Sequence, residues 1–343
     1  MKQVAVTAPD TCLRRFSVAA LASCLGLLGV TFALNLVVDP FALAGTHVVP
    51  SAVEADRSIK LTLIERLKQP PETLILGSSR SRQAEPAFLQ TLTDRTGFNA
   101  GVTGGSAADA WVFVRYTADR FPKAKRRYIW FVDAGIATNG VNPQLAADPR
   151  AAKYLRGGGF RLSDVGTYVG TQASRASVRV LDKCVFHTCR APIRYRPDGS
   201  LPHGELAALP EQSKGLKAEV AKLVASVRAH PPVAVHPDPR RYVYFERALA
   251  FMNTRGERPV IVFNPVFPSV LTELEKYGFP EHQASLDYLR RLHTRFDFVV
   301  VDGEDIGRWG GTRADFSNPT HINWRNMRRL LRYVVAHSDR ALR

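Results

Sequence analysis

The chain has 343 residues, of which 45% are hydrophobic and 23% charged, and its formal net charge is +16 at pH 7. This composition excludes a disordered chain, and the length suits one large domain or two small ones. The basic charge is compatible with nucleic acid, an anionic membrane surface or an acidic polymer as partner, so cellular location must decide among them.

The first expected element is a membrane-spanning helix. Residues 16–38 form an almost unbroken apolar run, and Lys2, Arg14 and Arg15 precede it. About 20 apolar residues cross a bilayer core as a helix, and positive charge before them favours a cytoplasmic N-terminus. We therefore predict an uncleaved signal anchor in the inner (cytoplasmic) membrane, with the C-terminal domain in the periplasm or outside. The predicted division is a cytoplasmic tail at 1–13, the anchor at 14–38, a juxtamembrane connector at 39–70, and a domain at 71–343 with an insertion at about 140–240.

Two processed forms compete with this prediction. A cleavable signal peptide usually has a shorter apolar region, and no convincing small-residue cleavage site follows Val38. Residues 21–24 (LASC) are similar to a lipoprotein cleavage box ending at Cys24, but the apolar stretch before it is short and the run continues beyond it. Export from the cytoplasm argues against nucleic acid as the partner.

Cys184 and Cys189 are the two cysteines outside the tail and the predicted span. In an exported region a disulfide can persist, so we expect a local disulfide between them, with two unrelated thiols as the alternative. A zinc site built from Cys184, His187 and Cys189 has no evident fourth ligand nearby, and we expect neither a metal nor a cofactor.

After residue 70 the pattern alternates between strand and helix signals. The expected strands are 73–76, 97–100, 128–132, 259–263 and 296–301, and the expected helices are a segment reaching about 92, then 107–121, 284–295 and 323–337. Short apolar runs of this kind suit buried parallel strands. The alternation favours a three-layer α/β domain with a mainly parallel, flavodoxin-like sheet.

Two regions stand apart from this rhythm. Residues 140–240 are rich in Gly, Pro, Arg and His, with three glycines at 157–159, and are typical of an insertion or a cap. The C-terminal helix places Arg325, Arg328, Arg329 and Arg332 on one face, which is either an ordinary solvated face or a surface for anions.

Three segments carry residues suited to chemistry. Gly77 ends a strand, and Ser78 and Ser79 follow where a helix should begin; a serine there is either a nucleophile or a simple helix cap. Residues 99–106 (NAGVTGGS) follow the next strand, and their glycines suit either an oxyanion hole or a plain turn. No Walker lysine and no G-x-G-x-x-G pattern is present, so nucleotide binding is poorly supported.

The third segment, 315–321 (DFSNPTH), ends in His321 beside an acidic residue and directly before the last helix. Histidine is the usual base for a serine nucleophile, and a third group orients its ring. An exposed histidine without a catalytic role is the alternative.

Together the three segments resemble the SGNH (GDSL-like) hydrolase and acyltransferase superfamily. Its Gly-Asp-Ser block is matched by Gly77-Ser78-Ser79, its Asn-x-Gly-x-x-Gly block by Asn99, Gly101 and Gly104, and its Asp-x-x-His block by His321. The resemblance implies that Ser79 is the nucleophile and His321 its base. It also implies that the backbone N–H groups of Ser79 and Gly104 form the oxyanion hole.

A narrower resemblance is to membrane-anchored envelope proteins of alginate O-acetylation and lipoteichoic-acid D-alanylation. The shared features are the N-terminal anchor, the Asp39-Pro40 pair, the Gly-Ser-Ser block and the late histidine. This likeness implies acyl transfer to or from a cell-envelope polysaccharide, beside a multi-spanning membrane protein that donates the acyl group.

The chain departs from the family pattern at two places. Asn318 stands where the family has the aspartate that orients the histidine, so either Asn318 or Asp315 is expected in that role. The Gly-x-Asn-Asp block is replaced by residues 133–136 (DAGI), which leaves one oxyanion donor unassigned. The expected function is therefore a serine esterase or O-acyltransferase. The alternative is a non-catalytic scaffold that binds an acidic glycan or a membrane partner.

Overall fold

The structure is a computed structural model that describes residues 10–40, 48–49, 56–135, 140–156, 169–185, 194–202, 212–233 and 239–342. The chain divides into two compact units. The first is Met1–Ala55 with Phe160–Pro192, and the second is Asp56–Gly159 with Ile193–Arg343.

The first unit contains α1 (Asp10–Val38) and α8 (Thr171–Val185). The segment Leu13–Val38 is long and apolar enough to span a membrane, with a mean hydropathy of 2.1. Asn35 is a polar residue of α1 that is fully buried. Its Nδ2 donates to Ser174 Oγ at 3.2 Å, and Ser177 Oγ donates to its Oδ1 at 2.7 Å, so α8 satisfies both ends of the amide.

Both cysteines of the predicted pair fall within the bounds of this unit, and Cys184 is among the described residues. Cys184, near the end of α8, is disulfide-bonded. Cys189 and His187 lie outside the described residues.

The second unit is built on five parallel strands in the order β2-β1-β3-β4-β5. Within the sheet, Ile75 lies opposite both Asn99 and Ile129. The strands are β1 (Thr73–Leu76), β2 (Gly97–Asn99), β3 (Arg127–Val132), β4 (Val260–Phe263) and β5 (Val299–Asp302). The predicted α/β class and parallel sheet are confirmed.

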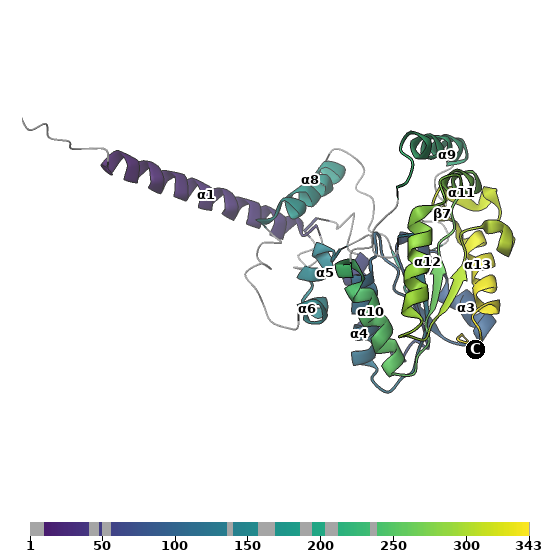
Figure 1. Ribbon diagram of the computed structural model, residues 1–343. Coiled ribbons are helices and arrows are strands. Elements are labelled where there is room, and N and C mark those ends of the chain that lie inside the picture. The colour runs from purple at the N-terminus through teal and green to yellow at the C-terminus, as the bar shows by residue number, and fades with distance from the viewer. Residues whose placement is uncertain are drawn as a thin grey trace, which may run out of the picture. The chain divides into compact units, whose positions relative to one another are not determined.

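Helices cover both faces of this sheet (Figure 1). Side chains alternate along a strand, so Leu74 and Leu76 enter one core while Ile75 enters the other. The Leu74 face is covered by α2 (Asp56–Arg66), α4 (Ala107–Arg120), α10 (Pro239–Thr254) and α12 (Pro280–Leu292). The Ile75 face is covered by α3 (Pro86–Thr93) and α13 (Trp324–Ala336).

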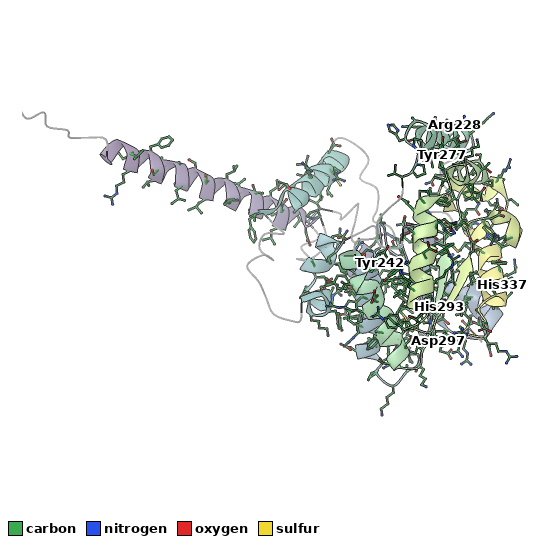
Figure 2. The ribbon with its side chains drawn as sticks, viewed as in Figure 1. Arg228, Tyr242, Tyr277, His293, Asp297 and His337 are labelled. Carbon is green, nitrogen blue, oxygen red and sulfur yellow. The ribbon has the colours of Figure 1, made fainter. Side chains whose placement is uncertain are left out.

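Further helices come between β3 and β5 in the order of the chain: α5 (Pro143–Ala147), α6 (Pro149–Arg156), α9 (Gln212–Ala229) and α11 (Pro268–Glu275). Arg228 of α9, labelled in Figure 2, forms an ion pair with Glu273 of α11 at 2.9 Å. Tyr242, also labelled there, stacks on Tyr288 of α12 with ring centroids 3.8 Å apart. The predicted insertion thus contains helices, while its three glycines at 157–159 lie outside the described residues.

The segment 194–202 runs along β2. The backbone N–H of Asn99 donates to the Asp198 carbonyl at 2.8 Å. Lys60, fully buried on α2, donates from Nζ to the carbonyl oxygens of Asn99, at 2.6 Å, and of Gly199. Gly199 has φ +78°, and a Cβ there would clash with the Asn99 carbonyl, so this close approach requires glycine.

The structure differs from the sequence expectations most clearly in the last strand and in a second sheet, and the helix expected at 284–295 is Pro280–Leu292. The last strand begins at Val299 rather than at 296, because Asn253 binds both the N–H and the carbonyl of Asp297, at 2.7 and 2.9 Å, and so keeps this residue out of the strand pairing. A second, antiparallel sheet of β6 (Phe316–Asn318) and β7 (His321–Ile322) was not expected.

Candidate functional site

Ser79 lies at a tight turn directly after β1. Gly77 has φ +145°, and a Cβ there would lie 2.8 Å from the carbonyl oxygen of Phe131, so the strand can end this way only at glycine. Ser78 Oγ accepts the N–H of Arg80 at 3.4 Å, and Ser81 Oγ donates to the Ser78 carbonyl at 2.8 Å. These bonds shape the short 3-10 helix Ser79–Ser81, of which Ser79 is the first residue.

Ser79, His321 and Asn318 form a continuous series of hydrogen bonds. Ser79 Oγ lies 2.8 Å from His321 Nε2, and His321 Nδ1 lies 3.0 Å from Asn318 Oδ1. Asn318 and His321 are paired across the β6–β7 hairpin, which places the amide beside the imidazole. The hairpin therefore brings the base and its orienting group to a serine 242 positions away in the chain.

The neighbours of Asn318 determine the imidazole tautomer. The N–H and Oγ1 of Thr320 approach Asn318 Oδ1 at 3.0 and 3.2 Å, which identifies that atom as an acceptor. His321 Nδ1 then carries the proton and donates to Asn318. Its Nε2 is left as the acceptor for the Ser79 hydroxyl, which is the arrangement that a general base requires.

The surroundings of His321 keep it neutral. Burial, together with the nearby cations Arg80 and Arg82, lowers its pKa to about 4, while Asp133 acts in the opposite direction. The ring is therefore unprotonated at pH 7 and free to accept a proton. The same surroundings disfavour the imidazolium that proton transfer creates.

Asp315, the other predicted orienting group, lies among different partners. It accepts hydrogen bonds from Arg329 at 2.6 Å, Thr312 at 2.7 Å and Asn323 at 3.0 Å. Burial acts to raise its pKa, but these hydrogen bonds lower it overall. Within the described part of the chain it makes no hydrogen bond to His321, so the geometry favours Asn318 as the group that orients the ring.

The glycine-rich loop 99–106 is joined to the serine turn by Asn99. The Asn99 amide donates to the carbonyls of Ser81, at 2.9 Å, and Ala84, at 2.6 Å, and it accepts the N–H of Gly101 at 2.8 Å. A Cβ on Gly105 would lie 3.2 Å from the Ser78 Cα and clash with the Gly77 carbonyl. The loop and the turn are thus in direct contact.

The two expected oxyanion donors are available. Among the described residues, none accepts a hydrogen bond from the backbone N–H of Ser79 or of Gly104. Gly104 has φ +58°, a conformation that favours glycine. A pocket opens beside the turn, and its lining includes Gly77, Ser78, Gly105, Ser106, Asp133 and Gly135.

Two site neighbours were not singled out as site residues by the sequence. Asp133 forms an ion pair with Arg80 at 3.1 Å and accepts a hydrogen bond from Asn264 Nδ2 at 2.8 Å. Asp133 and Asn264 directly follow β3 and β4, at the strand ends where parallel α/β sheets place ligand sites, and this position is the signal that identifies them.

In the part of the chain that the structure describes, no three His, Cys, Asp or Glu residues are grouped so that they could hold a metal ion. No protein-family model and no curated protein matches the chain. The geometry of Ser79, His321, Asn318 and the glycine-rich loop is therefore what indicates the function.

Proposed function

We propose that this chain is a serine esterase or O-acyltransferase of the SGNH type, working through an acyl-enzyme on Ser79. The observation that carries the proposal is the hydrogen-bond series from Ser79 through His321 to Asn318, at 2.8 and 3.0 Å. A nucleophile bonded to a base that a third group orients is the signature of an activated serine.

The chemistry begins with attack of Ser79 Oγ on an ester carbonyl carbon while its proton passes to His321 Nε2. The carbonyl oxygen becomes an oxyanion that accepts the N–H groups of Ser79 and Gly104. When this intermediate collapses, the ester C–O bond breaks and His321 returns the proton to the leaving alcohol. Water or a sugar hydroxyl then attacks the acyl carbon and loses its proton to His321. The bond from the acyl carbon to Ser79 Oγ breaks, and His321 returns the proton to Ser79.

The substrate class follows from location and charge. The helix Leu13–Val38 is able to anchor the chain, and a net charge of +16 favours an anionic polymer as partner. We infer a cell-envelope polysaccharide or glycopolymer as acyl donor or acceptor, with a multi-spanning membrane protein as a source of acyl groups. A C-terminal alkaline phosphatase fusion tests this placement, because that enzyme folds only outside the cytoplasm; an inactive but expressed fusion would contradict it.

The decisive experiment uses the full chain in detergent micelles and a fluorophosphonate probe, with the modified residue identified by mass spectrometry. We expect labelling at Ser79 that is lost in Ser79→Ala and in His321→Ala. The matched control is His337→Ala, since His337 lies at the far end of α13 (Figure 2) and contacts Tyr333 rather than the serine. It should label like the wild type.

Absence of labelling on a folded wild-type chain would reject the esterase proposal. The alternative is then a scaffold that binds an acidic glycan without chemistry. The observation that favours this alternative is the low pKa of His321, about 4, in a site that has an amide rather than a carboxylate beside the ring. Salt-sensitive glycan binding by the unlabelled protein would support it.

A further inference from the structure

The peptide group that carries the Gly104 N–H is held from its other side by a buried arginine. Arg57 of α2 donates from Nη2 to the carbonyl oxygen of Thr103 at 3.2 Å. The same guanidinium donates to both carboxylate oxygens of Asp109, at 2.6 and 3.0 Å. Arg57 and Asp109 are each 2% exposed, so this ion pair has little freedom to change its geometry.

The partners of Arg57 are themselves fixed. Asp109 accepts the N–H of Ser106 at 2.9 Å in the capping box that starts α4. On the preceding peptide group, the N–H of Thr103 donates to Asp56 at 2.9 Å. Neighbouring residues of α2 therefore hold both peptide groups that flank Thr103, one through its N–H and the other through its carbonyl.

Because a peptide group is planar, the hydrogen bond to the Thr103 carbonyl also fixes the direction of the Gly104 N–H. The described chain has no cis peptide bonds, and in a trans peptide the C=O and the following N–H point in opposite directions. Because Arg57 fixes the Thr103 carbonyl, the Gly104 N–H points away from Arg57 and remains free of acceptors among the described residues. Glycine has no Cβ to resist rotation, so without Arg57 this peptide group has a low barrier to turning over.

We propose that Arg57 is a positioning residue that aims the Gly104 N–H at the oxyanion formed during acylation of Ser79. This inference rests on the proposed esterase or acyltransferase function and adds a residue to it. If the peptide group turned over, it would present the Thr103 carbonyl to the developing negative charge. Removal of Arg57 is therefore expected to slow the reaction by about 100-fold, the scale measured when one oxyanion donor is lost.

The test compares two double variants of the full chain in detergent. Arg57→Met/Asp109→Asn removes the guanidinium and its countercharge together, so no unpaired charge stays buried, and the new amide keeps an acceptor for Ser106. The matched control is Arg150→Met/Asp148→Asn. That pair also has two hydrogen bonds, at 2.9 and 2.7 Å, and binds a carbonyl of α2, that of Ser58, but it does not contact the glycine loop.

The measured quantity is the rate constant for fluorophosphonate labelling of Ser79 as a function of pH. For the Arg57 variant we expect a plateau lowered by about 100-fold with an unchanged midpoint, since His321 is untouched, whereas the control should keep the wild-type rate. A folded Arg57 variant that reacts at the wild-type rate, or one slowed no more than the control, would overturn the inference.

A measurement on the wild-type chain remains decisive if the variant does not fold. In protein with ¹⁵N-labelled glycine, the Gly104 amide proton should move downfield once Ser79 is phosphonylated, because it gains a charged acceptor. An unmoved Gly104 resonance on a labelled protein would refute the role of Gly104 and with it that of Arg57. Failure of the wild type to label at all would instead reject the proposed function itself, and the inference with it.

Discussion

Replacing Asn318 by aspartate should make His321 a stronger base and Ser79 more reactive. Asn318 Oδ1 lies 3.0 Å from His321 Nδ1 and accepts the N–H of Thr320 at 3.0 Å, and a carboxylate oxygen can accept both of these hydrogen bonds. Among the described residues, none accepts a hydrogen bond from Asn318 Nδ2, so the second carboxylate oxygen would displace no existing bond. Asn318→Asp therefore adds a negative charge to the site while the packing is retained.

The size of the effect follows from the charge. A carboxylate in contact with a cation shifts a pKa by about 1 to 3 units, and one unit corresponds to about 1.4 kcal/mol. The pKa of His321 should rise from about 4 into the range of about 5 to 7. Because the imidazolium forms during attack by the serine, the same interaction should accelerate labelling by about 10- to 1000-fold above the new midpoint.

The assay is the pH dependence of fluorophosphonate labelling, measured on the full chain in detergent. Asp315→Asn is the matched control: it changes the other candidate orienting group by a similarly small substitution, and Asp315 makes no hydrogen bond to His321 within the described residues. The midpoint should move in Asn318→Asp and stay in place in Asp315→Asn. A folded Asn318→Asp protein with an unmoved midpoint, or a shift in the control, would refute the assignment of Asn318.

Two further predictions concern stability. The pKa of His321 is about 4 in the folded state and about 6.5 in the unfolded chain, so the native state binds fewer protons between these values and stability rises with pH there. Between pH 7 and pH 4, the free energy of unfolding measured in urea should fall by about 3 kcal/mol more for the wild type than for His321→Gln. An equal fall in the two proteins would contradict this prediction. Gly105→Ala should lower both stability and labelling, because its Cβ would clash with the Gly77 carbonyl. The control is Gly215→Ala in α9, where nothing lies within 4 Å of the added carbon; it should raise the free energy of unfolding by up to about 1 kcal/mol. If Gly105→Ala and Gly215→Ala changed stability to a similar extent, the packing argument would be rejected.

The sheet is predictable from the sequence because two of its inner strands, β1 and β4, are fully buried. Residues 73–76 and 260–263 are uninterrupted apolar runs covered on both faces, and such runs have few other stable placements. The hairpin Phe316–Ile322 is different. Its two strands contain the polar residues Ser317, Asn318 and His321, so they show no alternation of apolar and polar residues. Their pairing depends on side-chain hydrogen bonds, which a hydrophobic periodicity does not predict.

The site is predictable only in part for a similar reason. Ser79 and Gly104 occupy strand-end turns, where parallel α/β sheets place ligand sites, but only the resemblance to the SGNH motifs selects them among their neighbours. The choice between Asn318 and Asp315 needs the hairpin geometry, because both residues are near His321 in sequence. Arg57 lies in the range predicted as a juxtamembrane connector, and its contact with Thr103 spans 46 positions, a distance that sequence pattern does not encode.

The segment that runs along β2 also protects the sheet from association with other copies. β2 is an outer strand of the parallel sheet, and an outer strand with free N–H groups is a template for pairing with another chain. Here the Asp198 carbonyl accepts the N–H of Asn99, and Lys60 donates hydrogen bonds to the carbonyls of Asn99 and Gly199. We therefore expect a side chain at Gly199, which would clash with the Asn99 carbonyl, to push this cover away and leave β2 open to edge-to-edge pairing.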